Sequence, residues 1–151
     1  MQKFEFPLER LLQVRRQQER LAEIEQLRSV AALDAARGRV RDLRAECERM
    51  STNLLAAVGQ TIAPHRWAAD RAEVARLGDA VAAAEAAASA AAEALRVAAR
   101  KRSVVAAEVE AIETLRREQM DNFRREFAKV EQDQVDEAGR RRWAAALTES
   151  E

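Results

Sequence analysis

Apolar positions recur along most of this chain at alternating steps of four and three residues. In the first third the repeat is strict over Ala36, Val40, Leu43, Cys47, Met50, Leu54 and Ala57, and it is looser over Leu11, Val14, Leu21, Ile24, Leu27 and Ala31. Further along it returns over Val74, Leu77, Val81, Ala84, Ala88, Ala91, Leu95 and Ala98. This spacing is typical of a coiled coil.

Two features interrupt the second series. Arg102 occupies an expected apolar position, with Glu23 as its nearest expected partner of opposite charge, and Val105, Val109 and Ile112 then continue the repeat. After Ile112 the apolar positions shift phase to Leu115, Phe123, Phe127 and Val130. A shift of this kind predicts a local unwinding of the supercoil.

The strongest break in the pattern lies between Gly59 and Pro64. Glycine suits the end of a helix and proline suits the first turn of the next helix. We therefore expect one helix over about residues 7–58, a turn over about 59–63 and a second helix over about 64–145. A short turn between two amphipathic helices makes them antiparallel. The expected fold is all-α: a single coiled-coil domain over residues 1–151, formed by an antiparallel hairpin with an overhanging C-terminal helix.

This hairpin predicts which distant residues meet. Leu43 is expected near Asp79, and Leu8 near Leu115. Phe4 and Phe6 are then expected to approach residues 115–127, where they would close the open end of the hairpin.

Composition supports a few long helices and argues against most kinds of active site. Charged residues make up 34% of the chain and aromatic residues 4%, with four glycines and two prolines, which is typical of coiled coils. Formal net charge is zero, so no excess of positive charge favours nucleic acid. We expect no membrane span.

The residues that usually carry chemistry are scarce. One cysteine, Cys47, falls at an apolar position of the first helix, and one histidine, His65, falls in the turn. They cannot form a common Cys/His metal site, and a single cysteine suits a reducing compartment. Acidic pairs such as Glu108 with Glu110, or Asp133 with Asp136, are expected on solvated helix surface. We expect no enzymatic activity, no cofactor, and no catalytic or metal-binding residues.

The N-terminal stretch FEFPLERLLQVRRQQERLAE (residues 4–23) resembles the start of the FliJ family of flagellar type III export proteins. The resemblance rests on Phe4, Phe6, Leu8, Leu11, Leu12, Arg15 and Glu19. Near the other end, REQMDNFRREFAKVEQDQVDEAGRRR (residues 117–142) is similar to the family's long polar helix, with Gln132, Asp136 and Glu137 at its characteristic positions.

The resemblance implies a cytoplasmic component of the flagellar export apparatus, peripheral to the inner membrane at the flagellar base. Family members are antiparallel coiled coils similar to the central stalk of rotary ATPases. Implied partners are the hexameric export ATPase, the cytoplasmic domain of the export gate and export chaperones. The implied ATPase contacts are Phe4, Phe6, Leu8, Leu11, Arg15, Arg16, Gln132, Asp136 and Glu137. Candidates for the gate contact are Arg39, Trp67 and Arg71.

Other functions remain open on sequence alone. The equivalent stalk of a virulence-type secretion system has the same architecture. A structural coiled coil that self-associates would use the same apolar positions between chains. A nucleic-acid binder could use the arginines of RGRVRDLR (residues 37–44), although Asp42, Glu46 and Glu48 dilute that charge.

Overall fold

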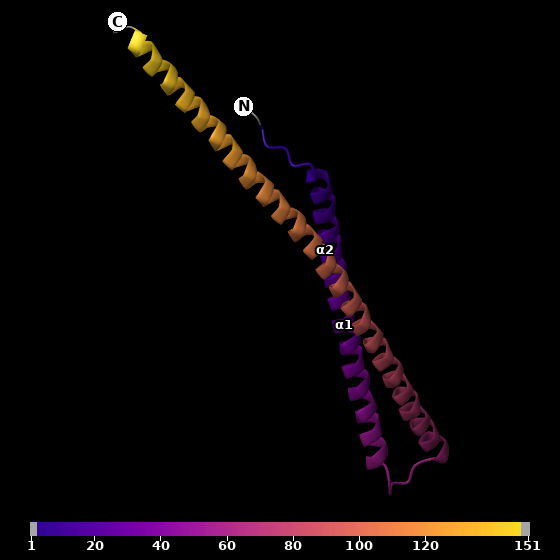
Figure 1. Cartoon of the computed structure of the whole chain (residues 1–151). Helices are drawn as coiled ribbons and strands as arrows, with labels where there is room; N and C mark the ends of the chain where they lie inside the picture. Colours follow the sequence, from indigo (N-terminus) through magenta and orange to yellow (C-terminus); the bar gives the residue numbers. More distant parts are fainter. Residues whose placement is uncertain (1–2, 149–151) are drawn as a thin grey trace. The chain divides into compact units, whose positions relative to one another are not determined.

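A computed structural model describes the backbone of residues 3–148 and the side chains of residues 3–145. Within this range the chain forms two α-helices and no strand (Figure 1): α1 over Glu9–Ala56 and α2 over Pro64–Thr148. The expectation of an all-α fold with two long helices is confirmed.

The ends of the helices follow from local chemistry. Pro7 and Leu8 form a turn, in which the Glu9 amide donates to the Phe6 carbonyl at 3.1 Å, so α1 begins at Glu9. After α1, Gly59 adopts a φ of 87°, a left-handed conformation that glycine takes without a Cβ clash. The Ala63 carbonyl then accepts the amides of Arg66 and Trp67, which starts α2 at Pro64.

The chain divides into two compact units. The terminal unit consists of Met1–Gln17 and Ala106–Glu151, and the turn unit is Gln18–Val105. Each unit therefore contains part of α1 and part of α2, and each has its own contacts between the two helices.

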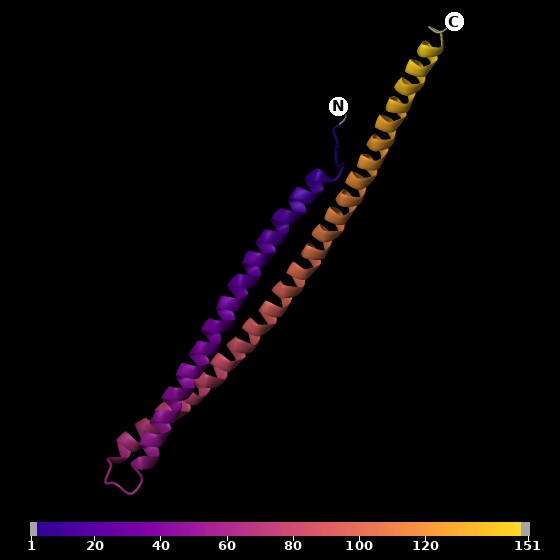
Figure 2. The ribbon, with the colours of Figure 1, turned by 90° about the vertical axis from the view of Figure 1, so that its left-hand side faces the viewer.

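Within the turn unit the two helices run antiparallel and are joined by the loop between Ala56 and Pro64 (Figure 2). Moving toward the N-terminus along α1, Arg44, Glu25 and Glu23 meet Glu85, Lys101 and Arg102 of α2, which lie progressively further toward its C-terminus. The residues buried between the helices are mostly aliphatic: Ala22, Leu33, Val40, Leu77, Ala84 and Ala98. Leu77 is 1% exposed.

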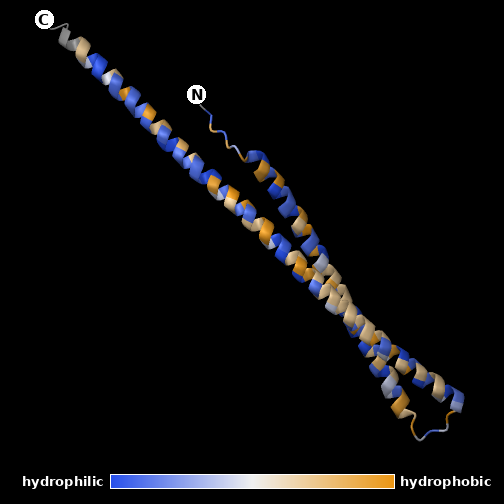
Figure 3. Ribbon diagram, turned by 45° about the vertical axis from the view of Figure 1, so that its right-hand side comes forward, coloured by the Kyte–Doolittle hydropathy of each residue, from blue (hydrophilic) through white to orange (hydrophobic). Residues whose placement is uncertain are grey.

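The terminal unit packs the N-terminal stretch and the start of α1 against α2. Phe6, Leu12 and Val109 form its buried core, and Leu12 is fully buried. From residue 124 to residue 145 of α2 every side chain is exposed. Figure 3 colours this last part of α2 mostly hydrophilic, with isolated hydrophobic positions.

The less exposed positions of each helix keep one uninterrupted four-and-three spacing, which corrects two expectations. On α1 the strict repeat extends back from Ala36 through Leu33, Ser29, Gln26, Ala22, Glu19, Arg15 and Leu12. The looser apolar positions expected at the interface are instead exposed: Leu11, Val14, Leu21, Ile24, Leu27 and Ala31. Because a coiled coil holds one phase along each helix, these residues fall on other faces.

On α2 the expected phase shift after Ile112 is also wrong. The repeat continues through Arg116, Gln119 and Phe123, which are partly buried, while Leu115 is 38% exposed. An arginine can take an interface position because its apolar stem packs there while the guanidinium reaches a carboxylate.

The two repeats interlock further along α2 than we expected. Gln26 and Arg102, which both occupy interface positions, are joined by a hydrogen bond of 3.2 Å. Leu43 lies 17 residues after Gln26, and Glu85 lies 17 residues before Arg102. In the antiparallel arrangement Leu43 therefore lies level with Glu85 and not with Asp79, which is exposed. The register is set by how the interface positions of the two repeats interlock, as at Gln26 and Arg102, and not by counting outward from the loop.

Candidate functional site

An aromatic cluster joins the N-terminal stretch to α2 in the terminal unit. The ring centroids of Phe4 and Phe123 lie 5.7 Å apart and are tilted by 53°. Phe123 stacks in turn on Phe127, with centroids 6.3 Å apart, and Phe6 is 8% exposed. Aromatic pairs at these distances attract each other beyond the area that they bury. The expected approach of the N-terminal phenylalanines to residues 115–127 is confirmed for Phe4.

Ion pairs hold α1 to α2 directly beside this cluster. Arg116 Nε donates to Glu9 Oε2 at 3.0 Å, and Arg16 donates to Glu113 Oε1 through Nε at 3.0 Å and Nη2 at 2.7 Å. All four side chains are about 40% exposed. Partial exposure limits the contribution of each pair to stability to about 0.2–1 kcal/mol.

Arg15, the residue before Arg16, makes a further ion pair with α2. Its Nη1 lies 3.1 Å from Glu108 Oε2, a buried oxygen that forms no hydrogen bond among the described residues. Arg15 and Arg16, both proposed from sequence as partner contacts, are thus engaged within the chain.

The apolar candidates of the N-terminal stretch are partly accessible. Leu8 is 36% exposed and Leu11 is 41% exposed, whereas the neighbouring Leu12 is buried. A partner can therefore reach Leu8 and Leu11 without unfolding this stretch.

The polar candidates near the C-terminus lie on the exposed part of α2. Gln132 Nε2 donates to Asp136 Oδ1 at 3.1 Å, and Glu137 pairs with Arg141 one turn further on. Both interactions are local to α2, since the partners are four residues apart. The nine candidate ATPase contacts all fall in the terminal unit.

The gate candidates fall in the turn unit, and the structure does not bring all of them together. Arg39 and Arg71 are exposed, and Trp67 is half-buried. Trp67 lines an apolar hollow at the end of the unit with Val58, Ile62 and Pro64. Trp67 and Arg71 lie one turn apart on α2, while Arg39 lies on α1.

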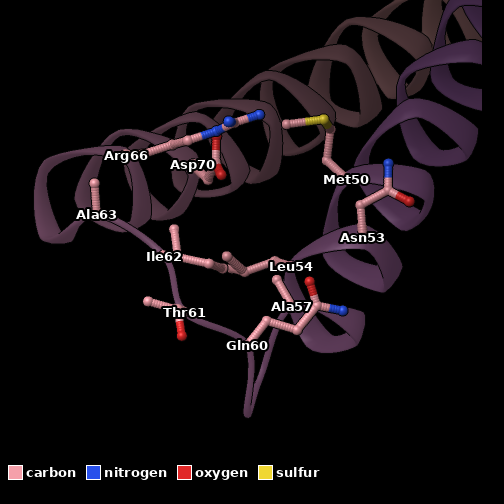
Figure 4. Close-up of a pocket in the computed structure, with 10 residues that line it drawn as sticks. All are labelled: Met50, Asn53, Leu54, Ala57, Gln60, Thr61, Ile62, Ala63, Arg66 and Asp70. Carbon is pink, nitrogen blue, oxygen red and sulfur yellow. The ribbon is translucent and has the colours of Figure 1, made fainter.

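A second hollow opens beside the loop (Figure 4), where Ile62 of the loop points toward Leu54 of α1. Its opposite wall carries Arg66 and Asp70 of α2. The end of the turn unit therefore offers a concave surface that the sequence pattern did not reveal.

Sites for other chemistry are not seen in the part of the chain that the structure describes. No group of three or more His, Cys, Asp or Glu residues is arranged to hold a metal ion. Cys47 is partly buried between the helices, and His65 is exposed at the start of α2. Over the same residues, neither helix contains a stretch that is apolar enough to span a membrane.

Comparison with known proteins relates most of the chain to a protein family. The model of the flagellar FliJ protein matches residues 4–148 of the 151 residues. The chain belongs to the FliJ family. FliJ proteins are coiled-coil components of flagellar protein export, and this chain accordingly has a role in that export and works with other proteins of the export apparatus. Comparison with curated proteins gave no match, and comparison with solved structures gave none either.

Sequence reasoning missed the carboxylates that pair with arginines across the two helices in the terminal unit of this FliJ chain. Glu9, Glu108 and Glu113 pair with Arg116, Arg15 and Arg16. The signal was available in the strict spacing from Leu12 onward, which places charged residues of both helices at or beside the interface. Nearby apolar residues obscure that signal when residue type alone is followed.

Proposed function

We propose that this FliJ chain is a non-enzymatic coiled-coil stalk that engages the hexameric export ATPase through its terminal unit. In this proposal it works in the cytoplasm, peripheral to the inner membrane, and links the ATPase to the export gate and to export chaperones. Membership of the FliJ family is the observation that carries the proposal.

The construction of the terminal unit supports this role. A segment that enters a protein ring must keep its shape under load. The N-terminal stretch is held to α2 by the Phe4–Phe123 contact, and the start of α1 is held by Arg116 and Arg16. Leu8 and Leu11 remain available for contact, and burying their exposed apolar surface against a partner would be favourable.

We further propose that the end of α2 overhangs the paired helices of a single-domain hairpin. All side chains from residue 124 to residue 145 are exposed, including Val130, Val135 and Trp143. A helix with so little packing gains little stability of its own in water, and a partner surface would stabilise it. Gln132, Asp136 and Glu137 would then contact the ATPase.

The gate contact is placed by this proposal at the other functional surface, the end of the turn unit. Trp67 lines an apolar hollow beside the loop, and Arg71 lies one turn further along α2. An aromatic residue in an apolar hollow suits a protein partner. Arg39 lies on α1, about 25 Å along the helix from Ala56, and would take part only in a gate contact that extends along the helices.

The proposal is tested with the purified chain and the hexameric export ATPase of the same organism. We expect association at low salt and a higher rate of ATP hydrolysis when the chain is added. Leu11→Gln and the double variant Asp136→Lys, Glu137→Lys should weaken both effects. A well-folded chain that neither binds nor stimulates this ATPase would overturn the proposal.

Matched controls come from the turn unit. Leu55→Gln removes an apolar side chain that is 71% exposed, and Asp79→Lys reverses an exposed charge. Both should leave binding and stimulation unchanged. The same assay with the ATPase of a virulence-type secretion system distinguishes the alternative, since the cognate ATPase should bind more tightly.

A further inference from the structure

An apolar stripe runs along the outer face of α1 in the turn unit. It consists of Leu21, Ile24, Leu27 and Ala31, which we call the outer stripe. Leu21 is 60% exposed, Ile24 is 45% exposed and Leu27 is 62% exposed, and Ala31 is also exposed. At 3.6 residues per turn these positions share one face, opposite the interface residues Ala22, Gln26 and Ser29.

The charged residues that share the face of the outer stripe are basic. Arg20 and Arg28 interleave with Leu21, Ile24 and Leu27 on the same face. Among the residues that the structure describes, neither arginine pairs with a carboxylate. Asp34 lies only at the far edge of the stripe.

The acidic residues at the margins of the stripe are already used within the turn unit. Glu25 Oε2 accepts from Lys101 Nζ at 2.8 Å, and Glu23 Oε1 accepts from Arg102 Nη2 at 3.1 Å. Both glutamates are thereby neutralised by α2. The outward face is left with apolar side chains and uncompensated guanidinium groups.

We propose that the outer stripe is a docking face for an acidic amphipathic helix of a partner protein. Leu21, Ile24 and Leu27 would pack against the apolar positions of that helix, in the spacing that helix pairs use. Arg20 and Arg28 would pair with its carboxylates. The inference does not rest on the proposed ATPase contact, because the outer stripe contains none of the residues assigned to it.

Charge argues against a second copy of this chain as the occupant. Arg20 and Arg28 each lie four residues from Ile24. An antiparallel pair of stripes centred on Ile24 therefore places Arg20 of one copy against Arg28 of the other, and a parallel pair places each arginine against itself. Like charges in such positions are repulsive. A lipid surface is the other possible occupant, and the vesicle measurement below tests it.

The test uses the full chain and a designed helical peptide of about 18 residues, with leucines at the spacing of one helix face and glutamates beside them. A matched peptide carries lysines in place of the glutamates. We expect fluorescence anisotropy to show binding of the acidic peptide only, and the binding should weaken as salt is raised. Ile24→Gln should weaken it about tenfold, whereas Leu55→Gln should not.

The variant Arg20→Glu, Arg28→Glu provides a second test that removes no buried side chain. It should lose the acidic peptide and gain the lysine peptide, while Arg49→Glu should change neither. Equal binding of both peptides, or an unchanged preference in the double variant, would overturn the proposal. Dimers that Ile24→Gln dissolves, or binding to anionic vesicles through Arg20 and Arg28, would assign the stripe to another occupant and overturn it equally.

Discussion

Arg102 Nη2 lies 3.1 Å from Glu23 Oε1, although 79 residues separate them along the chain. The other guanidinium nitrogen, Nη1, donates to Gln26 Oε1 at 3.2 Å. One arginine at an interface position is thus bonded to two residues on successive turns of α1. A polar residue at such a position fixes the register of a coiled coil, since any shift leaves its charge without partners.

The first prediction concerns the energy of this pair. In a double-mutant cycle, Glu23→Gln and Arg102→Gln should show a coupling of about 0.5 kcal/mol, because both side chains are 40–49% exposed. Urea denaturation at low salt measures the coupling, and high salt should reduce it. Strictly additive effects at low salt would show that the contact does not contribute to stability.

The second prediction concerns the loop. Gly59 has a φ of 87°, and a Cβ added there meets no atom within 4 Å. Gly59→Ala should therefore destabilise the chain by about 1–2 kcal/mol through backbone strain alone. Gly78 also has free space around it but lies within α2, so Gly78→Ala should stabilise the chain by up to about 1 kcal/mol. Thermal unfolding of the two variants should move in opposite directions, and a shift in the same direction contradicts this account.

The third prediction concerns the aromatic cluster. Phe123 touches both Phe4 and Phe127, so Phe123→Ala should release the N-terminal stretch from α2. Amide hydrogen exchange at Glu9 and Leu12, whose amides bond to Phe6 and Leu8, should become faster. Val130→Ala, which changes a side chain that is 52% exposed, serves as the control. Unchanged protection at Glu9 in the Phe123 variant would mean that the cluster does not hold the stretch.

The fourth prediction concerns pH. A hydrogen bond from Arg76 lowers the pKa of Glu73 below its ordinary value, and Arg96 lowers that of Glu93 in the same way. A lowered pKa in the folded state means that each pair stabilises α2 above the unfolded value, about pH 4.3. This stabilisation disappears as pH falls through the lowered pKa.

Carboxyl carbon NMR shifts measure these titrations directly. Glu73 should titrate closer to an ordinary glutamate in the Arg76→Gln variant, and Glu93 should not change there. A Glu73 titration that is the same with and without Arg76 would contradict the assigned cause.

Much of the fold was predictable because the interface residues of a coiled coil recur in the sequence at a regular spacing. Gly59 and Pro64 marked the loop, and the strict repeat from Ala36 to Ala57 marked the interface of α1. The register was less predictable, since it depends on how two repeats interlock. Arg102 and Gln26, two polar residues, mark it better than any apolar pair.

The candidate site was predictable only in part for a related reason. The apolar residues in the N-terminal part of α1 suggested an interface, but Leu21, Ile24 and Leu27 are exposed. Arg15 and Glu19 occupy the interface positions there instead. Residue type alone therefore pointed to the wrong face of α1. Extending the strict repeat back from Ala36 toward the N-terminus, through polar and apolar residues alike, predicts the correct interface face of α1.

The central claim is that the terminal unit binds the export ATPase. Hydrogen–deuterium exchange of the chain, alone and in complex with the hexameric ATPase, tests it most directly. We predict slower exchange on binding within residues 3–17 and 106–148, strongest around Gln132 and Asp136, and unchanged exchange within residues 18–105. Protection confined to residues 18–105, with residues 106–148 exchanging as in the free chain, would contradict it.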